Sequence, residues 1–145
     1  MVIKDFFDKT VFLDTAPLIY FIEGHSEYQS KLKELFGLAD QGEFNFVSST
    51  LTLLEVLVKP LKEDKKEIVE TYTEYLTSAK GIDLFDIDIS TAKTAAHLRA
   101  KYNLRTPDSI QIAMAIVLGA DFFLTNDNRL GVITEVKVVT LPDLE

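Results

Sequence analysis

The chain has 145 residues, of which 47% are hydrophobic, enough for one domain with a full core, so we do not expect disorder. It contains no cysteine, which excludes disulfides, thiolate metal sites and thiol nucleophiles, and it has only two histidines. The net charge of −8, from 23 acidic and 15 basic residues, argues against a broad nucleic-acid-binding surface, which is normally basic. Neither a signal sequence nor a membrane span is expected, so we interpret residues 1–145 as one cytoplasmic domain.

The first part of the chain alternates short apolar runs with segments of helical periodicity. Bulky apolar runs predict strands, and apolar residues at three- and four-residue spacing predict helices. Pro17 is expected in a first helical turn, where proline is tolerated, and Pro60 is expected to end a helix. In chain order, the expected elements are the strand Thr10–Asp14, the helices Ala16–Ile22 and Ser26–Ala39, the strand Phe44–Val47 and the helices Leu51–Lys59 and Asp64–Ala79.

The second part continues the same alternation. It predicts the strand Ile82–Ile87, the helices Ser90–Tyr102 and Thr106–Leu118, and the strands Asp121–Leu124 and Val136–Thr140. Strands separated by helices of this length imply crossover connections. We therefore expect an α/β protein, a three-layer α/β/α sandwich around a mainly parallel sheet of about five strands.

Four acidic residues stand where acids are locally unfavourable. Asp14 ends an apolar strand, Glu55 lies among leucines that we expect to be core positions, including Leu54, and Asp108 opens an apolar helix. Asp127 follows another apolar strand. Burying one unpaired carboxylate costs several kcal/mol, so the set suggests one shared cation. Oxygen-only ligands favour Mg²⁺ or Mn²⁺.

Each acid also has a local explanation. Asp14 is a suitable helix N-cap, and Asp108 in a first turn favours the helix dipole. Thr52 and Glu55 have the spacing of a capping box, and Asp127 lies in an ordinary turn sequence. A helix start near Ser49 or Thr50 would instead leave Glu55 mid-helix, so we favour the shared site over four separate caps.

The same stretches resemble the PIN domain family, in particular VapC-type toxins. The resemblance runs from Val11 to Val139 and is carried by Phe12–Tyr20, Ser49–Val56, Leu98–Tyr102, Thr106–Ala113 and Gly119–Asp127. It implies a metal-dependent endoribonuclease that cleaves RNA and serves as the toxin of a type II toxin–antitoxin system. An antitoxin protein partner and a homodimer are implied as well.

The resemblance carries a site onto this sequence. It implies Asp14, Glu55, Asp108 and Asp127 as the acidic catalytic residues, supported by Thr125 and Asn126. From the chemistry we expect one or two Mg²⁺ or Mn²⁺ ions held by the three aspartates, with Glu55 binding directly or through water. Two further groups are candidates: the hydroxyls of Thr15 and Thr125 to orient water or carboxylates, and the basic side chains of Arg99, Lys101 and Arg105 to bind substrate phosphates.

Other functions stay open at this stage. A PIN-fold protein without a toxin role could act as a housekeeping RNA or DNA nuclease, or as a catalytically silent protein-binding module. An aspartyl-phosphate phosphatase is disfavoured because position 16 is Ala rather than Asp. A flap endonuclease is disfavoured because basic DNA-binding elements are missing.

Overall fold

A computed structural model describes all 145 residues, Met1–Glu145. The strands are β1 (Thr10–Leu13), β2 (Asn45–Ser49), β3 (Ile82–Phe85), β4 (Phe122–Thr125) and β5 (Lys137–Thr140). The α-helices are α1 (Thr15–Glu23), α2 (Gln29–Asp40), α3 (Thr50–Lys62), α4 (Lys66–Ser78), α5 (Ile89–Tyr102) and α6 (Thr106–Val117). Three short 3-10 helices are η1 (Ile3–Phe6), η2 (Asn128–Val132) and η3 (Leu141–Asp143).

The five strands form one sheet in the order β3-β2-β1-β4-β5, and every pair is parallel. Phe12 on the central strand aligns with Val47 of β2 and with Phe123 of β4. The predicted α/β/α fold with five strands is confirmed. Strands β2 and β3 are added on one side of β1, and β4 and β5 are then added on its other side. This reversal makes the boundary between β1 and β4 a topological switch point. Ligands of open α/β sheets bind at the carboxyl edge beside such a point.

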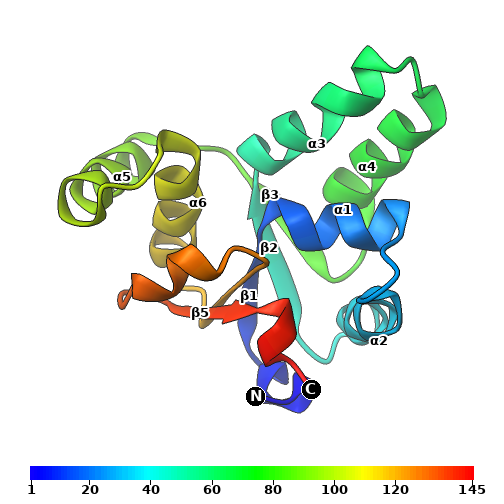
Figure 1. Cartoon of the computed structure of the whole chain (residues 1–145), viewed down its shortest axis with the longest axis horizontal. Coiled ribbons are helices and arrows are strands. Elements are labelled where there is room, and N and C mark those ends of the chain that lie inside the picture. The colour runs from blue at the N-terminus through cyan, green and yellow to red at the C-terminus, as the bar shows by residue number, and fades with distance from the viewer.

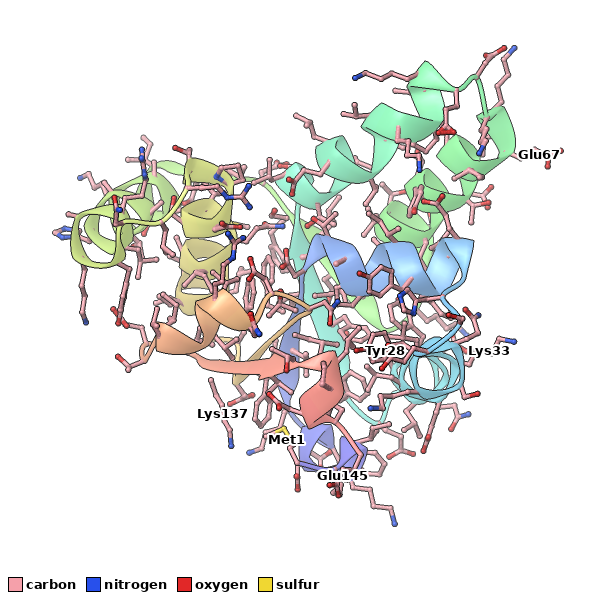
Figure 2. All side chains as sticks on the ribbon, in the orientation of Figure 1. Met1, Tyr28, Lys33, Glu67, Lys137 and Glu145 are labelled. Carbon is pink, nitrogen blue, oxygen red and sulfur yellow. The ribbon has the colours of Figure 1, made fainter.

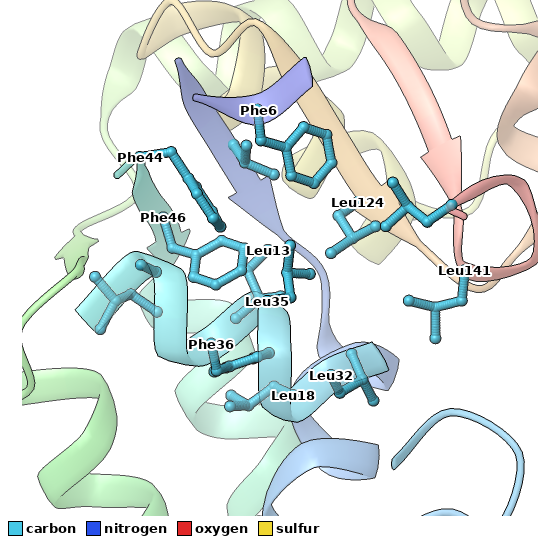
Figure 3. Close-up of a cluster of buried hydrophobic side chains, with 14 of the residues drawn as sticks. Phe6, Leu13, Leu18, Leu32, Leu35, Phe36, Phe44, Phe46, Leu124 and Leu141 are labelled. Carbon is cyan, nitrogen blue, oxygen red and sulfur yellow. The ribbon is translucent and has the colours of Figure 1, made fainter. Parts of the chain in front are cut away.

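Helices cover both faces of the sheet. Helices α1 to α4 lie on one side and α5 and α6 on the other (Figure 1). Alternate residues of a strand point to opposite faces, so Val11 and Leu13 join the core under α1 to α4, whereas Phe12 joins the core under α5 and α6. Figure 3 shows the larger of the two cores, with Leu13 packed among side chains of α1 and α2.

Both termini lie at the amino-terminal edge of the sheet. The Glu145 amide donates to the Met1 carbonyl at 3.0 Å, and these two residues appear close together in Figure 2. Phe6 of η1 packs against Phe44 and Phe122, next to the starts of β2 and β4. Glu67 lies at the far tip of the α3–α4 hairpin (Figure 2). The termini therefore leave the carboxyl edge of the sheet uncovered.

Several element ends differ from the sequence prediction. The expectation that Pro60 ends a helix is wrong: α3 begins at Thr50 and runs through Pro60 to Lys62. Proline removes one amide donor, and the helix continues for only two residues beyond it, so the loss is confined to the final turn. Helix α2 begins at Gln29 rather than Ser26, and β3 ends at Phe85 rather than Ile87. None of the helices combines the length and apolar character that a membrane span requires.

Candidate active site

A cleft of about 280 Å³ opens at the carboxyl edge of β1 and β4, where α1, α3 and α6 begin. The four acidic residues singled out in the sequence all line it, although they lie on four separate segments of the chain. The full lining is Asp14, Thr15, Ala16, Ile19, Tyr20, Glu55, Arg105, Pro107, Asp108, Gln111, Thr125, Asn126 and Asp127.

Asp14 connects β1 to α1 and lies deepest among the acids. It is the N-cap of α1, with Oδ1 accepting from the Thr15 amide at 2.8 Å, so the capping explanation is correct for this residue. Its Oδ2 accepts from the Thr125 hydroxyl at 2.8 Å. Burial raises the pKa of Asp14 to about 6; the Thr125 and Thr15 hydrogen bonds oppose the rise, and Glu55 and Asp108 add to it. The local surroundings thus disfavour an isolated charge at this position.

Glu55 lies in the second turn of α3 and is half-buried against α1. Thr15 Oγ1 donates to its Oε1 at 3.0 Å. Ser49 is the N-cap of α3, so Thr52 does not act as the helix cap, and a local capping box does not account for Glu55. The expectation that Leu54 is a core position is wrong, because Leu54 is 59% exposed. The preceding side chain therefore faces solvent, while Glu55 faces the cleft.

Two arginines form ion pairs with the other two acids, Asp108 and Asp127. Arg105, the residue before α6, donates from Nε to Asp108 Oδ2 at 3.1 Å. Arg129 donates to both oxygens of Asp127, from Nε at 2.9 Å and from Nη2 at 2.7 Å. These hydrogen bonds hold the pKa of Asp127 below its ordinary value. Asp127 is also the N-cap of η2, which confirms its place in a turn.

The four acids of the cleft fit a hard divalent cation in their chemistry, because all of them offer carboxylate oxygens. In this structure Arg105 pairs with Asp108 and Arg129 pairs with Asp127. With these pairs formed, no group of three or more acidic or histidine side chains has the spacing of a metal site. Carboxylates without a cation repel one another, and guanidinium groups compensate two of them here. The two arginines occupy part of the acceptor capacity of Asp108 and Asp127, so a cation held by all three aspartates would compete with these ion pairs.

The three basic residues predicted to contact substrate lie in different surroundings. Arg105 lines the cleft. Arg99 donates to the Leu104 carbonyl at 2.9 Å, and Lys101 pairs with Glu135 at 3.3 Å. Neither Arg99 nor Lys101 belongs to the cleft lining, because α5, which carries both, lies on the outer side of α6.

The sequence prediction assigned no role in the site to Tyr20 and Gln111, which line the cleft, or to Arg129, which pairs with Asp127 beside it. Tyr20 reaches it from the second turn of α1, and its hydroxyl accepts from Asn126 Nδ2 at 3.2 Å. Gln111 lines the cleft one turn after Asp108. A signal for Gln111 exists in the sequence, since it is a lone amide in the apolar run Ser109–Ala120. Arg129 offers no such signal, because an arginine after a turn is ordinarily solvent-exposed.

The fold and the acidic cleft define an α/β protein with an oxygen-rich site at the switch point of a parallel sheet. A sequence model of the PIN domain matches residues 11–136, and the chain belongs to the PIN domain family. No curated protein matches the chain.

Solved structures share the fold at low sequence identity. VapBC2 from Rickettsia felis, bound to a promoter DNA fragment, gives a TM-score of 0.73 at 17% identity, covering 90% of this chain and 98% of that chain. DNA-bound VapBC from Salmonella typhimurium gives 0.71 at 20% identity, covering 92% and 98%. VapC20 from Mycobacterium tuberculosis, described as a sarcin–ricin loop cleaving toxin, gives 0.68 at 11% identity, covering 88% and 98%. These similarities extend the fold assignment over nearly the whole chain.

Proposed function

We propose that this chain is an endoribonuclease that depends on Mg²⁺ or Mn²⁺ and acts as the toxin of a type II toxin–antitoxin system. The observation that carries the proposal is the convergence of Asp14, Glu55, Asp108 and Asp127 on one cleft from four separate segments. Burial, with a smaller contribution from the neighbouring acids, raises the pKa of Asp14 to about 6, so a charged Asp14 is unfavourable without a compensating cation.

Each acid has a place in this scheme. Asp14, Asp108 and Asp127 hold the cation, and Glu55 binds it directly or through a water molecule. When bound, the cation activates water and stabilises the leaving oxygen in an in-line displacement at the phosphodiester. Arg105, once it has left Asp108, is placed to contact a phosphate from the cleft wall.

The hydroxyls of the cleft orient the carboxylates. Thr125 is fully buried at the end of β4 and donates to Asp14, and it accepts from the Asp127 amide at 3.1 Å. Thr15 fixes Glu55 in the same way. Asn126 donates to Tyr20 and so ties the loop after β4 to α1. These hydrogen bonds link the ends of β1 and β4 to each other and to α1, and they link the start of α1 to Glu55 on α3.

The choice of RNA as substrate and of a toxin role rests on the family and on what similar structures are described as doing. VapC20 is described as a sarcin–ricin loop cleaving toxin, and VapBC-5 from Mycobacterium tuberculosis is described as a member of the VapBC family of toxin–antitoxin systems. An antitoxin partner and a homodimer are part of the proposal for the same reason. A net charge of −8 agrees with a substrate that is held chiefly through cations and a few arginines rather than through a wide basic surface.

The test is a cleavage assay with the purified chain. We expect a mixed RNA pool to be cut with Mn²⁺ or Mg²⁺ and to stay intact with EDTA, and we expect Asp108→Asn to abolish cutting while leaving the circular dichroism spectrum unchanged. Single-stranded DNA of matched length is the control substrate. Cutting that persists in Asp108→Asn at the wild-type rate would overturn the assignment, and preference for DNA would favour the housekeeping nuclease. A protein that binds an antitoxin but cuts nothing would be a silent binding module.

A further inference from the structure

We infer that four buried polar side chains, Ser48, Ser49, Thr52 and Gln111, form a positioning network that sets the spacing of Glu55, Asp108 and Asp14 and thereby the metal affinity of the cleft. The inference rests on the proposed function, since it concerns the geometry of that site. The four side chains are between 0% and 2% exposed and come from the end of β2, the start of α3 and the middle of α6. None of them is expected to bind the cation.

Short hydrogen bonds join the four side chains into one chain of contacts. Gln111 Nε2 donates to Thr52 Oγ1 at 2.6 Å, and Ser49 Oγ donates to Gln111 Oε1 at 2.5 Å. Ser48 Oγ lies 2.9 Å from Thr52 Oγ1 and 2.9 Å from the Leu13 carbonyl oxygen. No buried side-chain nitrogen or oxygen of the protein lacks a hydrogen-bond partner, so every polar atom of the network has at least one.

The chemistry of the groups gives the network a direction. The Leu13 carbonyl can only accept, so the single Ser48 proton points to it, and the Thr52 proton then points to Ser48. The Gln111 amide can donate to Thr52 and accept from Ser49 at the same time. An amide side chain meets both requirements, whereas a carboxylate at this position could not donate to Thr52.

Each end of the network lies next to an acid of the cleft. Gln111 follows Asp108 by three residues on α6, and Thr52 precedes Glu55 by three residues on α3, so each pair shares one face of its helix. The Leu13 carbonyl immediately precedes Asp14. The hydrogen bonds therefore tie together the three elements that carry these acids.

Apolar packing does not make this connection. Helix α3 packs its Val56 into the core with α1, α2 and α4, whereas α6 packs Ile112 into the core on the other face of the sheet. Hydrophobic contacts tolerate small shifts, but hydrogen bonds have narrow ranges of length and angle. Buried polar groups add little net stability compared with apolar side chains of the same volume, so their benefit at this place is precise spacing.

The first test is Gln111→Met in the full chain, a change that keeps the approximate volume and removes both amide hydrogen bonds. We expect Mn²⁺ affinity, measured by titration calorimetry on folded protein, to fall about 10-fold or more, the size seen when groups that orient metal ligands are removed. Ile112→Val is the control: it destabilises the same helix through its apolar core contacts, and we expect it to leave Mn²⁺ affinity unchanged.

A pair of Thr52 variants separates positioning from packing. Thr52→Val keeps the volume and removes the hydroxyl, and we expect it to weaken Mn²⁺ binding as Gln111→Met does. Thr52→Ser loses a methyl group and keeps the hydroxyl, so it should lower the melting temperature yet retain Mn²⁺ affinity. The double variant Thr52→Val with Gln111→Met should bind about as well as either single variant, because both break one network.

The outcomes decide clearly. The network would be overturned if Gln111→Met and Thr52→Val both bound Mn²⁺ with wild-type affinity. It would also be overturned if Thr52→Ser lost as much Mn²⁺ affinity as Thr52→Val. If Gln111→Met does not fold, the two Thr52 variants decide alone. Additive losses in the double variant would contradict it as well. Failure of the wild-type protein to bind Mn²⁺ at all would overturn the proposed function, and this inference with it.

Discussion

At the scale of single residues, the acids of the cleft combine local and shared roles. Asp14 caps α1 and Asp127 caps η2, as their sequence neighbours suggest, yet both also line the cleft. The same backbone geometry serves both roles, because a cap residue at a strand–helix junction lies at the carboxyl edge of a parallel sheet. Capping and ligand binding at such a position are therefore not competing explanations.

Asp14→Asn tests the electrostatic strain of the metal-free site. The folded-state pKa of about 6 exceeds the ordinary value of 3.8, so the folded protein binds more protons than the unfolded chain between about pH 4 and pH 6. The stability of the wild-type protein in EDTA should fall through that window and then level off. Asparagine resembles the neutral acid, so the variant should equal the wild type near pH 4 and exceed it by about 1–3 kcal/mol at pH 7. Urea unfolding at both pH values measures the difference.

The control for this experiment is Asp86→Asn, which removes one acidic charge from an exposed residue outside the cleft. We expect its stability to follow the wild-type curve at every pH. A destabilised Asp14→Asn protein at pH 7 would show that the carboxylate contributes more through its hydrogen bonds than it loses through burial.

Thr125→Val tests the hydroxyl that supports two of the acids. Valine has nearly the same shape, but it leaves Asp14 Oδ2 and the Asp127 amide without their Thr125 partner. We expect about 1–3 kcal/mol of destabilisation and about a 10-fold loss of Mn²⁺ affinity by calorimetry. Thr140→Val is the matched control, because Thr140 pairs with Thr125 across β4 and β5 but donates to Asp143 outside the cleft. Equal losses of Mn²⁺ affinity in both variants would argue against a specific role for Thr125.

At the scale of elements, the entry into β3 depends on one close approach of two backbones. Gly81 has a φ of +83°, and a Cβ atom there would lie 2.4 Å from the Ala39 carbonyl oxygen at the end of α2. Gly81→Ala should therefore lower stability by more than the roughly 1–2 kcal/mol of a left-handed alanine, as measured by thermal unfolding. Gly37→Ala lies within α2 with open space around its Cβ position, and it should raise stability by about 0.5–1 kcal/mol. A mild effect of Gly81→Ala would mean that α2 can move away from β3.

The elements themselves were largely predictable, and their ends less so. Periodicity placed the strands and helices in order, and this order implied the parallel sheet. Periodicity could not predict that Pro60 lies in the last turn of α3. The Pro60 side chain is buried there, although proline lacks the amide donor of the helix. The acids were found because carboxylates stand out in apolar runs. Thr15 and Thr125 were expected to orient water or carboxylates, and each donates to an acid of the cleft. Which acid each one contacts could not be predicted, because Thr125 and Asp14 are 111 positions apart and nothing in local sequence links them.

At the scale of the whole molecule, the cleft lies where the two helical layers meet the edge of one sheet. Asp14 and Asp127 come from the strand side, Glu55 from the layer of α1 to α4, and Asp108 from the layer of α5 and α6. A cation bound by all of them would link both layers and the sheet. The ion pairs Arg105–Asp108 and Arg129–Asp127 each lie within one short segment of the chain, so they do not join the layers to one another. Exposed ion pairs of this kind contribute little to the free energy of unfolding. A cation that joins the layers should therefore stabilise the whole fold.

The corresponding prediction is a rise in melting temperature with Mg²⁺ or Mn²⁺. A ligand at 100 times its Kd adds about 2.7 kcal/mol, which for a chain of this size amounts to about 6–10 °C. Differential scanning fluorimetry in EDTA and in millimolar Mn²⁺ measures the shift, with KCl at equal ionic strength to separate binding from screening of repulsion. Asp108→Asn should lose most of the Mn²⁺ shift and keep its response to KCl. An equal shift in KCl and Mn²⁺, or a full Mn²⁺ shift in Asp108→Asn, would mean that the acids of the cleft do not act together on one cation.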